Sequence, residues 1–362
     1  MIGGSEIVSN IKRHRVTVCN MQNDNKFLDT LVEVLDSGVF EKISLVTQNS
    51  HSASYLNKLL SDINRVERFV PLYDVEPTEL SIIYGVNSID TEDIDYYING
   101  SSRVVLFNDK YSIQKLHLSD LHKKDVYTID LPDWEYKSGG INSFINDVLN
   151  YSTIKYKDII NRKYENVYLT LSFKPSLPGF LEPLISVVDR YMQNGYDLYK
   201  DIFILTPSIR GKYGSLFLND YLRKHFNKNI AKIQYGANLK NFEFVEKDKV
   251  ISKISDADKG IIAGEEGTVE GVTRSSITVH YYGIDKKVDY LKSEADKKIS
   301  LAYAMNAGSC HSGRKKLSIL FLHSADFVRI DNFLIYTAAI KTHGRLHIIS
   351  DKSALYLALN KR

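Results

Sequence analysis

Cysteine is almost absent from this 362-residue sequence, which holds only Cys19 and Cys310. Two cysteines make no disulfide framework, and the 10 histidines show no ligand spacing such as HExxH, so we expect no metal. No apolar run approaches the roughly 20 residues that cross a membrane, and the first residues lack the apolar core of a signal peptide. No Ser-His-Asp or Cys-His catalytic set can be assembled either. We therefore expect a cytoplasmic protein without a membrane partner.

The rest of the composition is that of an ordinary globular protein, with 43% hydrophobic and 25% charged residues. A chain of this length predicts two domains. The net charge of +3 permits nucleic-acid binding without arguing for it. The abundance of Asn, Lys, Ile and Tyr, including 24 tyrosines, is typical of an AT-rich genome and favours a virus, a phage or a low-GC bacterium as the source.

Apolar runs of strand length alternate with amphipathic helical stretches over most of the chain. The predicted strands are 15–19, 42–47, 103–107, 126–129, 166–172, 201–206, 317–322 and 345–350, and the predicted helices include 181–192, 215–226 and 326–341. Strands that alternate with helices predict an α/β fold with parallel sheets. Between about 251 and 297, glycines separate short alternating runs, which predicts a small antiparallel barrel that interrupts the second α/β domain.

The stretch CNMQNDNKFLD (19–29) occupies the place of a phosphate-binding loop. It lies between the first predicted strand and a helix with Phe27, Leu28, Leu31, Val34 and Leu35 on one face, and it contains a lysine. A phosphate loop needs glycines so that its backbone N–H groups can wrap the phosphates, and this turn has none. On its own it is either a phosphate loop that has lost its chemistry or an ordinary turn.

Several segments, in order along the chain, resemble the RecD/Dda/UvrD group of superfamily 1 helicases. DIFILTPSIRGKYGSLFLNDYLRKHFN (201–227) resembles motif IV, IIAGEEGTVEGV (261–272) the hairpin that opens an inserted barrel, SLAYAMNAGSCHSG (300–313) motif V, and FLIYTAAIKTHGRLHIISD (333–351) motif VI. RVVLFND (103–109) and residues 127–149 then fall at motifs II and III. The resemblance covers most of the chain. It implies two RecA-like, P-loop-type lobes, residues 1–165 and residues 166–251 with 298–362, and a small β-barrel inserted at 252–297.

The residues that the family uses at the Walker A loop are largely replaced. Asn20 and Asn25 stand where the glycines belong, and an asparagine side chain projects into the space that phosphates need. Lys26 is kept. Phe27 replaces the Ser or Thr that binds magnesium, and an aromatic ring cannot ligate a hard cation. The resemblance therefore implies a Walker loop relic.

The other catalytic motifs also lack the residues that the family uses for catalysis. Asn108 and Asp109 replace the motif II Asp-Glu pair, which holds magnesium and positions the attacking water. Motif III has no Gln between 130 and 140, and motif V reads GSCHS (308–312) in place of HKSQG. The motif VI arginine becomes Lys341, which cannot bind a phosphate in a planar bidentate way. Arg210, which in the family faces the nucleotide cleft, is either a retained anion-binding residue or a turn residue.

These combined losses predict that the fold is retained and the ATPase lost. Removing one charge-stabilising element typically lowers turnover by about 10²–10⁵-fold. We therefore expect no cofactor. ATP and magnesium would bind only if Lys26, Asp109 and Lys341 sustain residual activity.

In the family, single-stranded nucleic acid runs across both lobes. The matched residues here are Thr47, Trp134, Tyr136, Lys137, Asn306, His311, Arg314, Lys315 and Lys316. Trp134, the only tryptophan, lies beside Tyr136 and Lys137, which suits base stacking with a phosphate contact, or else it fills the interface between lobes. The basic run SGRKK (312–316) suits phosphates or is a solvated turn.

The leading hypothesis is a catalytically inactive, helicase-like protein that binds single-stranded nucleic acid or serves as an accessory subunit. Its protein partners would belong to DNA replication or recombination, or to a viral assembly. A protein–protein scaffold without nucleic-acid contact is one alternative. A residually active ATP-dependent DNA helicase is the other.

Overall fold

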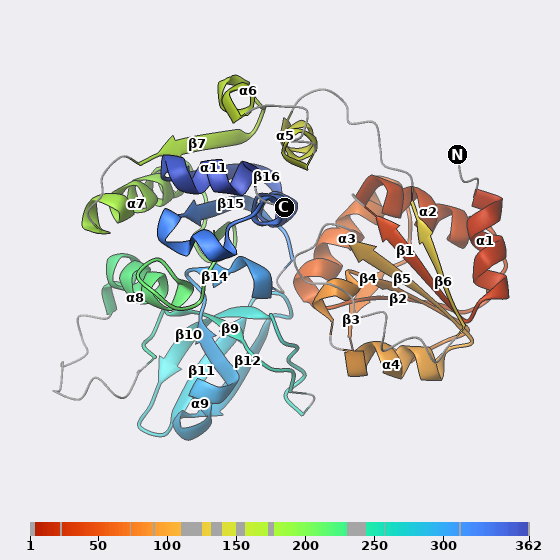
Figure 1. Cartoon of the computed structure of the whole chain (residues 1–362). Coiled ribbons are helices and arrows are strands. Elements are labelled where there is room, and N and C mark those ends of the chain that lie inside the picture. The colour runs from red at the N-terminus through yellow and green to blue at the C-terminus, as the bar shows by residue number, and fades with distance from the viewer. Residues whose placement is uncertain are drawn as a thin grey trace. The chain divides into compact units, whose positions relative to one another are not determined.

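The chain divides into two compact units, Met1–Glu135 and Tyr136–Arg362 (Figure 1). The computed structural model describes residues 4–21, 24–72, 74–89, 91–109, 125–131, 140–149, 156–172, 177–229, 244–256, 258–310 and 313–360. The division falls before the expected boundary at residue 165. The reason is that helices α5 (Gly140–Leu149) and α6 (Tyr156–Asn161) pack against α10 (Asn332–Ile340) and α11 (Lys352–Asn360), respectively, in the second unit.

The first unit is built on a six-stranded parallel sheet in the order β3-β2-β4-β5-β1-β6. Its strands are β1 (Val16–Met21), β2 (Ile43–Thr47), β3 (Phe69–Pro71), β4 (Leu80–Tyr84), β5 (Arg103–Asp109) and β6 (Val126–Asp130). Its helices are α1 (Gly4–Arg13), α2 (Asp24–Asp36), α3 (Ser50–Asp62), η1 (Val86–Ser88) and α4 (Thr91–Gly100). Apolar residues of α1, α2 and α3 share one core with the sheet. The predicted parallel α/β organisation is confirmed here.

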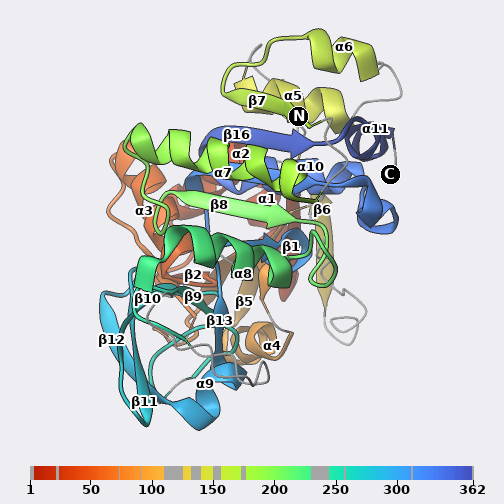
Figure 2. The same ribbon diagram turned by 90° about the vertical axis from the view of Figure 1, so that its left-hand side faces the viewer.

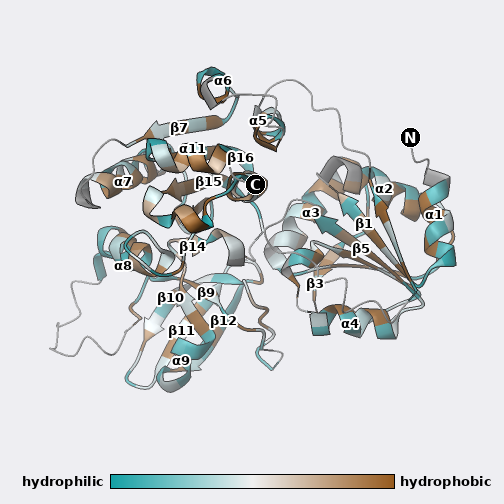
Figure 3. Ribbon diagram, in the orientation of Figure 1, coloured by the Kyte–Doolittle hydropathy of each residue, from teal (hydrophilic) through white to brown (hydrophobic). Residues whose placement is uncertain are grey.

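The second unit contains a five-stranded parallel sheet in the order β14-β8-β15-β16-β7. Its strands are β7 (Val167–Leu171), β8 (Ile202–Thr206), β14 (Met305–Asn306), β15 (Lys315–Leu322) and β16 (Thr342–Ser350). Helices α7 (Leu177–Gln193) and α8 (Ser215–Phe226) join the core of this sheet, and η4 (Ala307–Ser309) and η5 (Ser324–Arg329) are short 3-10 turns. Figure 3 shows hydrophobic residues along many of the strands of both parallel sheets.

An antiparallel sheet interrupts the second unit between β8 and β15. Its order is β12-β11-β10-β9-β13, with β9 (Lys249–Ser252), β10 (Glu266–Val272), β11 (Ser276–Tyr281), β12 (Lys286–Leu291) and β13 (Ile299–Leu301), and α9 (Lys292–Lys298) before the last strand. Figure 2 shows these strands beside α8. Gly267 permits the close approach of β10 to β11, because a Cβ there would lie 2.4 Å from the His280 carbonyl oxygen. No pairing joins β12 to β13 within the described ranges, so closure into a barrel stays a prediction.

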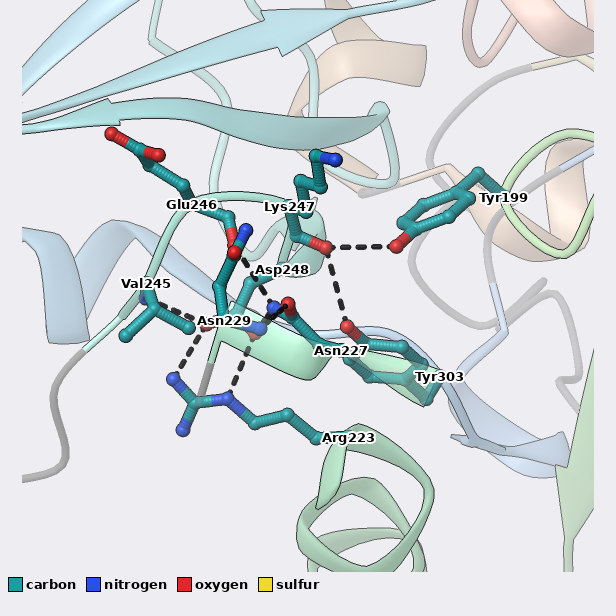
Figure 4. A network of polar contacts seen from close by, with 9 residues as sticks. All are labelled: Tyr199, Arg223, Asn227, Asn229, Val245, Glu246, Lys247, Asp248 and Tyr303. Atoms are coloured by element: carbon teal, nitrogen blue, oxygen red, sulfur yellow. Dashed lines mark hydrogen bonds and ion pairs between the residues drawn. The ribbon is translucent and has the colours of Figure 1, made fainter. Parts of the chain in front are cut away.

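A buried polar network joins the end of α8 to the start of β9 (Figure 4). The Arg223 guanidinium donates to both carboxylate oxygens of Asp248, from Nε at 2.8 Å and from Nη2 at 2.7 Å. Asn227 Nδ2 donates to the same carboxylate at 2.9 Å, and the Val245 N–H donates to it at 2.8 Å. Burial raises the pKa of Asp248, while the charge of Arg223 opposes that rise. This network fixes the point at which the antiparallel sheet leaves the parallel one.

None of the helices in the described ranges is both long and apolar enough to cross a bilayer.

Candidate nucleotide and nucleic-acid site

Polar side chains meet at the carboxyl ends of three neighbouring strands in the first unit, where parallel sheets generally bind ligands. Asn20 on β1 is aligned with Asn108 on β5 and with Asp130 on β6. The Asn20 Nδ2 donates to Asp130 Oδ1 at 2.7 Å, and the Asn108 Nδ2 donates to Asn20 Oδ1 at 2.5 Å. These three side chains therefore bond one another across the sheet edge on which a phosphate loop would sit.

Asp109 is anchored through its backbone at the same edge. Its N–H donates to Asn87 Oδ1 at 2.7 Å, and Asn87 Nδ2 donates back to its carbonyl oxygen at 3.3 Å. The neighbouring strand β4 ends at Tyr84 and is followed by Gly85. No strand in the described part of this sheet ends in two adjacent carboxylates. The magnesium-binding pair that the resemblance calls for is thus missing from each of these strand ends.

Phe27 points into the core of the first unit. Its ring lies 4.6 Å from Tyr84, 4.8 Å from Phe107 and 5.8 Å from Phe69, measured between ring centroids, and no part of the residue is exposed. Asn25 and Lys26 lie in the first turn of α2, and their side chains fall outside the described part of the chain. The residue that the sequence resemblance aligns with a magnesium ligand is therefore a core residue in this structure.

In the second unit, Arg210 is exposed on the turn that connects β8 to α8. The turn needs Gly211, whose φ is +100°. The turn also supplies hydrogen-bond acceptors for the first N–H groups of α8. The Ser215 N–H donates to the Ser208 carbonyl at 2.9 Å, and the Leu216 N–H donates to the Ile209 carbonyl at 3.1 Å. These two helix N–H groups are therefore already bonded within the chain, while the exposed side chains of Arg210 and Lys212 on this turn are accessible to an anion.

Lys341 follows α10 as its C-cap residue and is partly buried. Its backbone carbonyl accepts the Lys315 N–H at 3.1 Å, which joins the end of α10 to the start of β15. Lys341 and Arg210 lie in the second unit, and Asn20, Phe27 and the strand-end residues lie in the first.

The structure divides the nucleic-acid candidates into three groups. Thr47 and Lys315 are buried, with 1% and 3% of their surface exposed, so their side chains are removed from the candidate set. Lys316 is exposed and lies 3.0 Å from Asp201, and Arg314 and Asn306 are partly buried. Trp134, Tyr136, Lys137 and His311 lie outside the described residues. Contacts of nucleic acid with Lys316, Arg314 and Asn306 stay predictions.

Lys315 is buried because it pairs with Glu266 on β10 of the antiparallel sheet. Its ammonium group also donates to the Tyr199 carbonyl at 2.9 Å and lies 4.5 Å from the Phe203 ring. A second buried ammonium, that of Lys249, lies 3.7 Å from the same carboxylate. Burial, with repulsion from Lys315, lowers the pKa of Lys249 to about 7.

The Lys249→Met variant should unfold with a weaker pH dependence than the wild type. Between pH 7 and the ordinary pKa of 10.5, the unfolded chain holds a proton on Lys249 that the folded chain has released. Folding stability therefore rises with pH over this window, by about 2 kcal/mol between pH 7 and pH 9 more than in the variant. Urea denaturation of both proteins at the two pH values measures this difference. Equal slopes would show that Lys249 keeps its ordinary pKa.

Sequence reasoning missed Asp130 and Asn87 as members of the strand-end cluster. Asp130 directly follows the predicted strand 126–129, so a search for polar residues at the ends of parallel strands would have found it. Asn87 gave no such signal, because the strand before it was not predicted.

No protein-family model matches this sequence, and no curated protein matches it. Among solved structures, the chain is similar to Bacteroides Pif1 bound to ssDNA, with 13% identity and a TM-score of 0.50 over 96% of this chain and 91% of that chain. It is also similar to Pif1 helicase from Bacteroides in complex with ADP-AlF3 and ssDNA, with 13% identity and a TM-score of 0.45 over the same shares. At this identity, the likeness to the first of these shows the fold alone, which is a helicase-like fold.

Proposed function

We propose that this protein is a helicase-like protein that binds single-stranded nucleic acid and does not turn over ATP. The observation that carries the loss of catalysis is the burial of Phe27 against Tyr84 and Phe107. A residue packed in this way cannot be replaced by a magnesium ligand without opening a cavity. The described side chains at this site therefore do not fit a magnesium nucleotide.

The bonded strand-end residues support the same proposal. In an active P-loop protein this edge is left open for phosphates, and backbone N–H groups line it. Here Asn20, Asn108 and Asp130 bond to one another instead. Asp130 also places a carboxylate at this edge, and a carboxylate repels a phosphate. An edge of this kind holds the sheet together and does not attract a nucleotide.

The proposal of nucleic-acid binding rests on the fold and on exposed cations of the second unit. The solved structure that shares the fold at a TM-score of 0.50 is bound to ssDNA. Arg210 and Lys316 are exposed here, and cations of this kind contact phosphates without reading sequence. Binding would therefore be governed by electrostatics, with stacking if Trp134 or Tyr136 takes part. We propose that such binding serves an accessory role in replication, in recombination or in a viral assembly.

Phosphate release from ATP tests the loss of catalysis. With magnesium and saturating single-stranded DNA, we expect turnover at least about 10³-fold below that of an active member of the family, because several charge-stabilising groups are missing. The Lys26→Ala variant is the matched control and should give the same background rate as the wild type. DNA-stimulated release that this substitution abolishes would instead establish a residually active helicase.

A further inference from the structure

Strand β7 is an outer strand of the parallel sheet in the second unit, and it is unusually exposed for such a sheet. Among the described strands it pairs only with β16, and no residue of VYLTL (167–171) is fully buried. Tyr168 and Leu169, whose side chains point to opposite faces, are 42% and 39% exposed. Strands of parallel sheets are normally covered on both faces. This strand therefore presents apolar side chains and a backbone edge that pairs with none of the other described strands.

The register shows which backbone groups face outward. The Leu346 N–H donates to the Asn166 carbonyl, and the Ser172 N–H donates to the Ser350 carbonyl, both at 2.9 Å. Even-numbered residues of β7 therefore direct their backbone groups to β16, and Val167, Leu169 and Leu171 direct theirs away from it. The Val167 N–H is bonded to the Tyr164 carbonyl at 3.4 Å. No backbone hydrogen bond to the outward groups of Leu169 occurs between described residues.

The other sheet edges carry features that oppose edge-to-edge pairing. Strand β3 ends at Pro71, β6 ends at Asp130, β12 begins with Lys286 and Lys287, and β13 and β14 span only 3 and 2 residues. Strand β7 spans 5 residues and contains no proline, charge or register shift. Of the edges that the structure describes, it is the one without such protection, and exposed edges of this kind readily pair with a strand of another chain.

We propose that β7 pairs antiparallel with β7 of a second copy of this chain, about a two-fold axis beside Leu169. In this arrangement Leu169 lies opposite Leu169 of the partner subunit, and the two exchange N–H and carbonyl hydrogen bonds. The Leu171 N–H donates to the Val167 carbonyl of the partner subunit. By symmetry, the Leu171 N–H of the partner subunit donates to the Val167 carbonyl of this chain. The one outward N–H that is already used, that of Val167, is not needed for any of these bonds.

The side chains of β7 suit this self-pairing. On one face, Val167 meets Leu171 of the partner subunit and Leu169 meets its own copy, so every contact is apolar. On the other face, Tyr168 lies opposite Thr170 of the partner subunit, a pair of strand-favouring residues. No charge opposes its like, because the strand is neutral. A two-fold interface needs such a self-complementary patch.

The dimer should form at moderate protein concentration. Stable interfaces bury about 1,200 Å² or more in total, which is more than one short strand pair supplies, so we expect a dissociation constant on the order of micromolar. This inference concerns assembly and is independent of nucleic-acid binding.

Sedimentation equilibrium of the full chain at about 1–100 μM covers this affinity range and tests the proposal. The wild type should shift from the mass of one chain to that of two, whereas Leu169→Lys should stay at one chain. Leu216→Lys, at a residue on α8 that is 60% exposed, is the matched control and should dimerise as the wild type does. A wild type that keeps the mass of one chain throughout, or a Leu169→Lys variant that still dimerises, overturns the proposal.

Hydrogen exchange of the wild type gives a readout that needs no substitution. The Tyr168 and Thr170 amides bond to β16 and should be protected at every concentration. The Leu169 and Leu171 amides should gain protection only as the dimer forms. Protection of Leu169 that does not depend on concentration would assign its partner to this same chain and overturn the proposed pairing.

Discussion

Replacing Phe27 by serine, the residue type of an active Walker loop, is expected to destabilise the first unit and to produce no ATPase. The ring is fully buried between α2 and the sheet, against Phe69, Tyr84 and Phe107. Removing a buried phenylalanine ring lowers the free energy of unfolding by about 3–5 kcal/mol, and the serine hydroxyl would add the penalty of a buried polar group. Urea denaturation of the full chain and phosphate release measure the two effects.

Phe27→Leu is the control for this substitution. It keeps an apolar side chain of related size and should lower stability by less than about 1.5 kcal/mol. If Phe27→Ser were as stable as Phe27→Leu, the side chain would lie outside the core. If it hydrolysed ATP, the remaining residues of the loop would still form a competent nucleotide site. Either result contradicts the assignment of Phe27 as a core residue that has replaced a magnesium ligand.

Replacing Asp248 by asparagine is expected to lower the free energy of unfolding of the second unit by about 3–5 kcal/mol. The substitution keeps the shape of the side chain and removes its charge. The Arg223 guanidinium, only 4% exposed, would then lose the charged carboxylate to which it donates two hydrogen bonds. Because Asp248 also accepts the Val245 N–H, the entry into β9 would loosen. Urea denaturation, followed by circular dichroism, measures this loss.

Helix α8, which carries Arg223, also offers a matched control for Asp248→Asn. Asp220 pairs with Lys224 at 2.7 Å on the surface of α8, where both side chains are about half exposed. Exposed pairs one helical turn apart contribute about 0.3–0.5 kcal/mol, so Asp220→Asn should change stability very little. If the two aspartate variants lost stability equally, the network in Figure 4 would not anchor the start of β9 to the end of α8.

Most of the parallel strands were predictable because they are runs rich in apolar and β-branched residues, and α2 because its apolar residues recur at helical spacing, whereas β3, β4 and β14 were not predicted. Phe27, Leu31 and Val34 are indeed buried. Strand β4 was missed because a serine interrupts its apolar run. Ser81 is fully buried, and its hydroxyl bonds to those of Ser44 and Ser101 at 2.7 Å each. Such a chain of buried hydroxyl groups forms only when three separate segments meet, so no local sequence pattern predicts it.

The candidate site was less predictable because long-range pairing decides which charges are exposed. Lys315 and Lys316 are neighbours in a basic run, yet Lys315 is buried and Lys316 is exposed. The partner of Lys315 is Glu266, the first residue of β10 in the inserted antiparallel sheet. Alternation along β15 places neighbouring side chains on opposite faces, but the sequence does not say which face is covered. The strand-end bonds of Asn20 likewise depend on the order of the strands in space.

Single-strand binding, measured with and without ATP and magnesium, tests the central claim most directly. Fluorescence anisotropy of a labelled single strand should show binding at about 50 mM salt and a steep loss of affinity at about 200 mM, since counterion release drives the association. If no nucleotide binds, as we propose, the affinity should be the same with ATP and magnesium present. An absence of binding at the lower salt concentration, or an affinity that the nucleotide changes, would contradict this account.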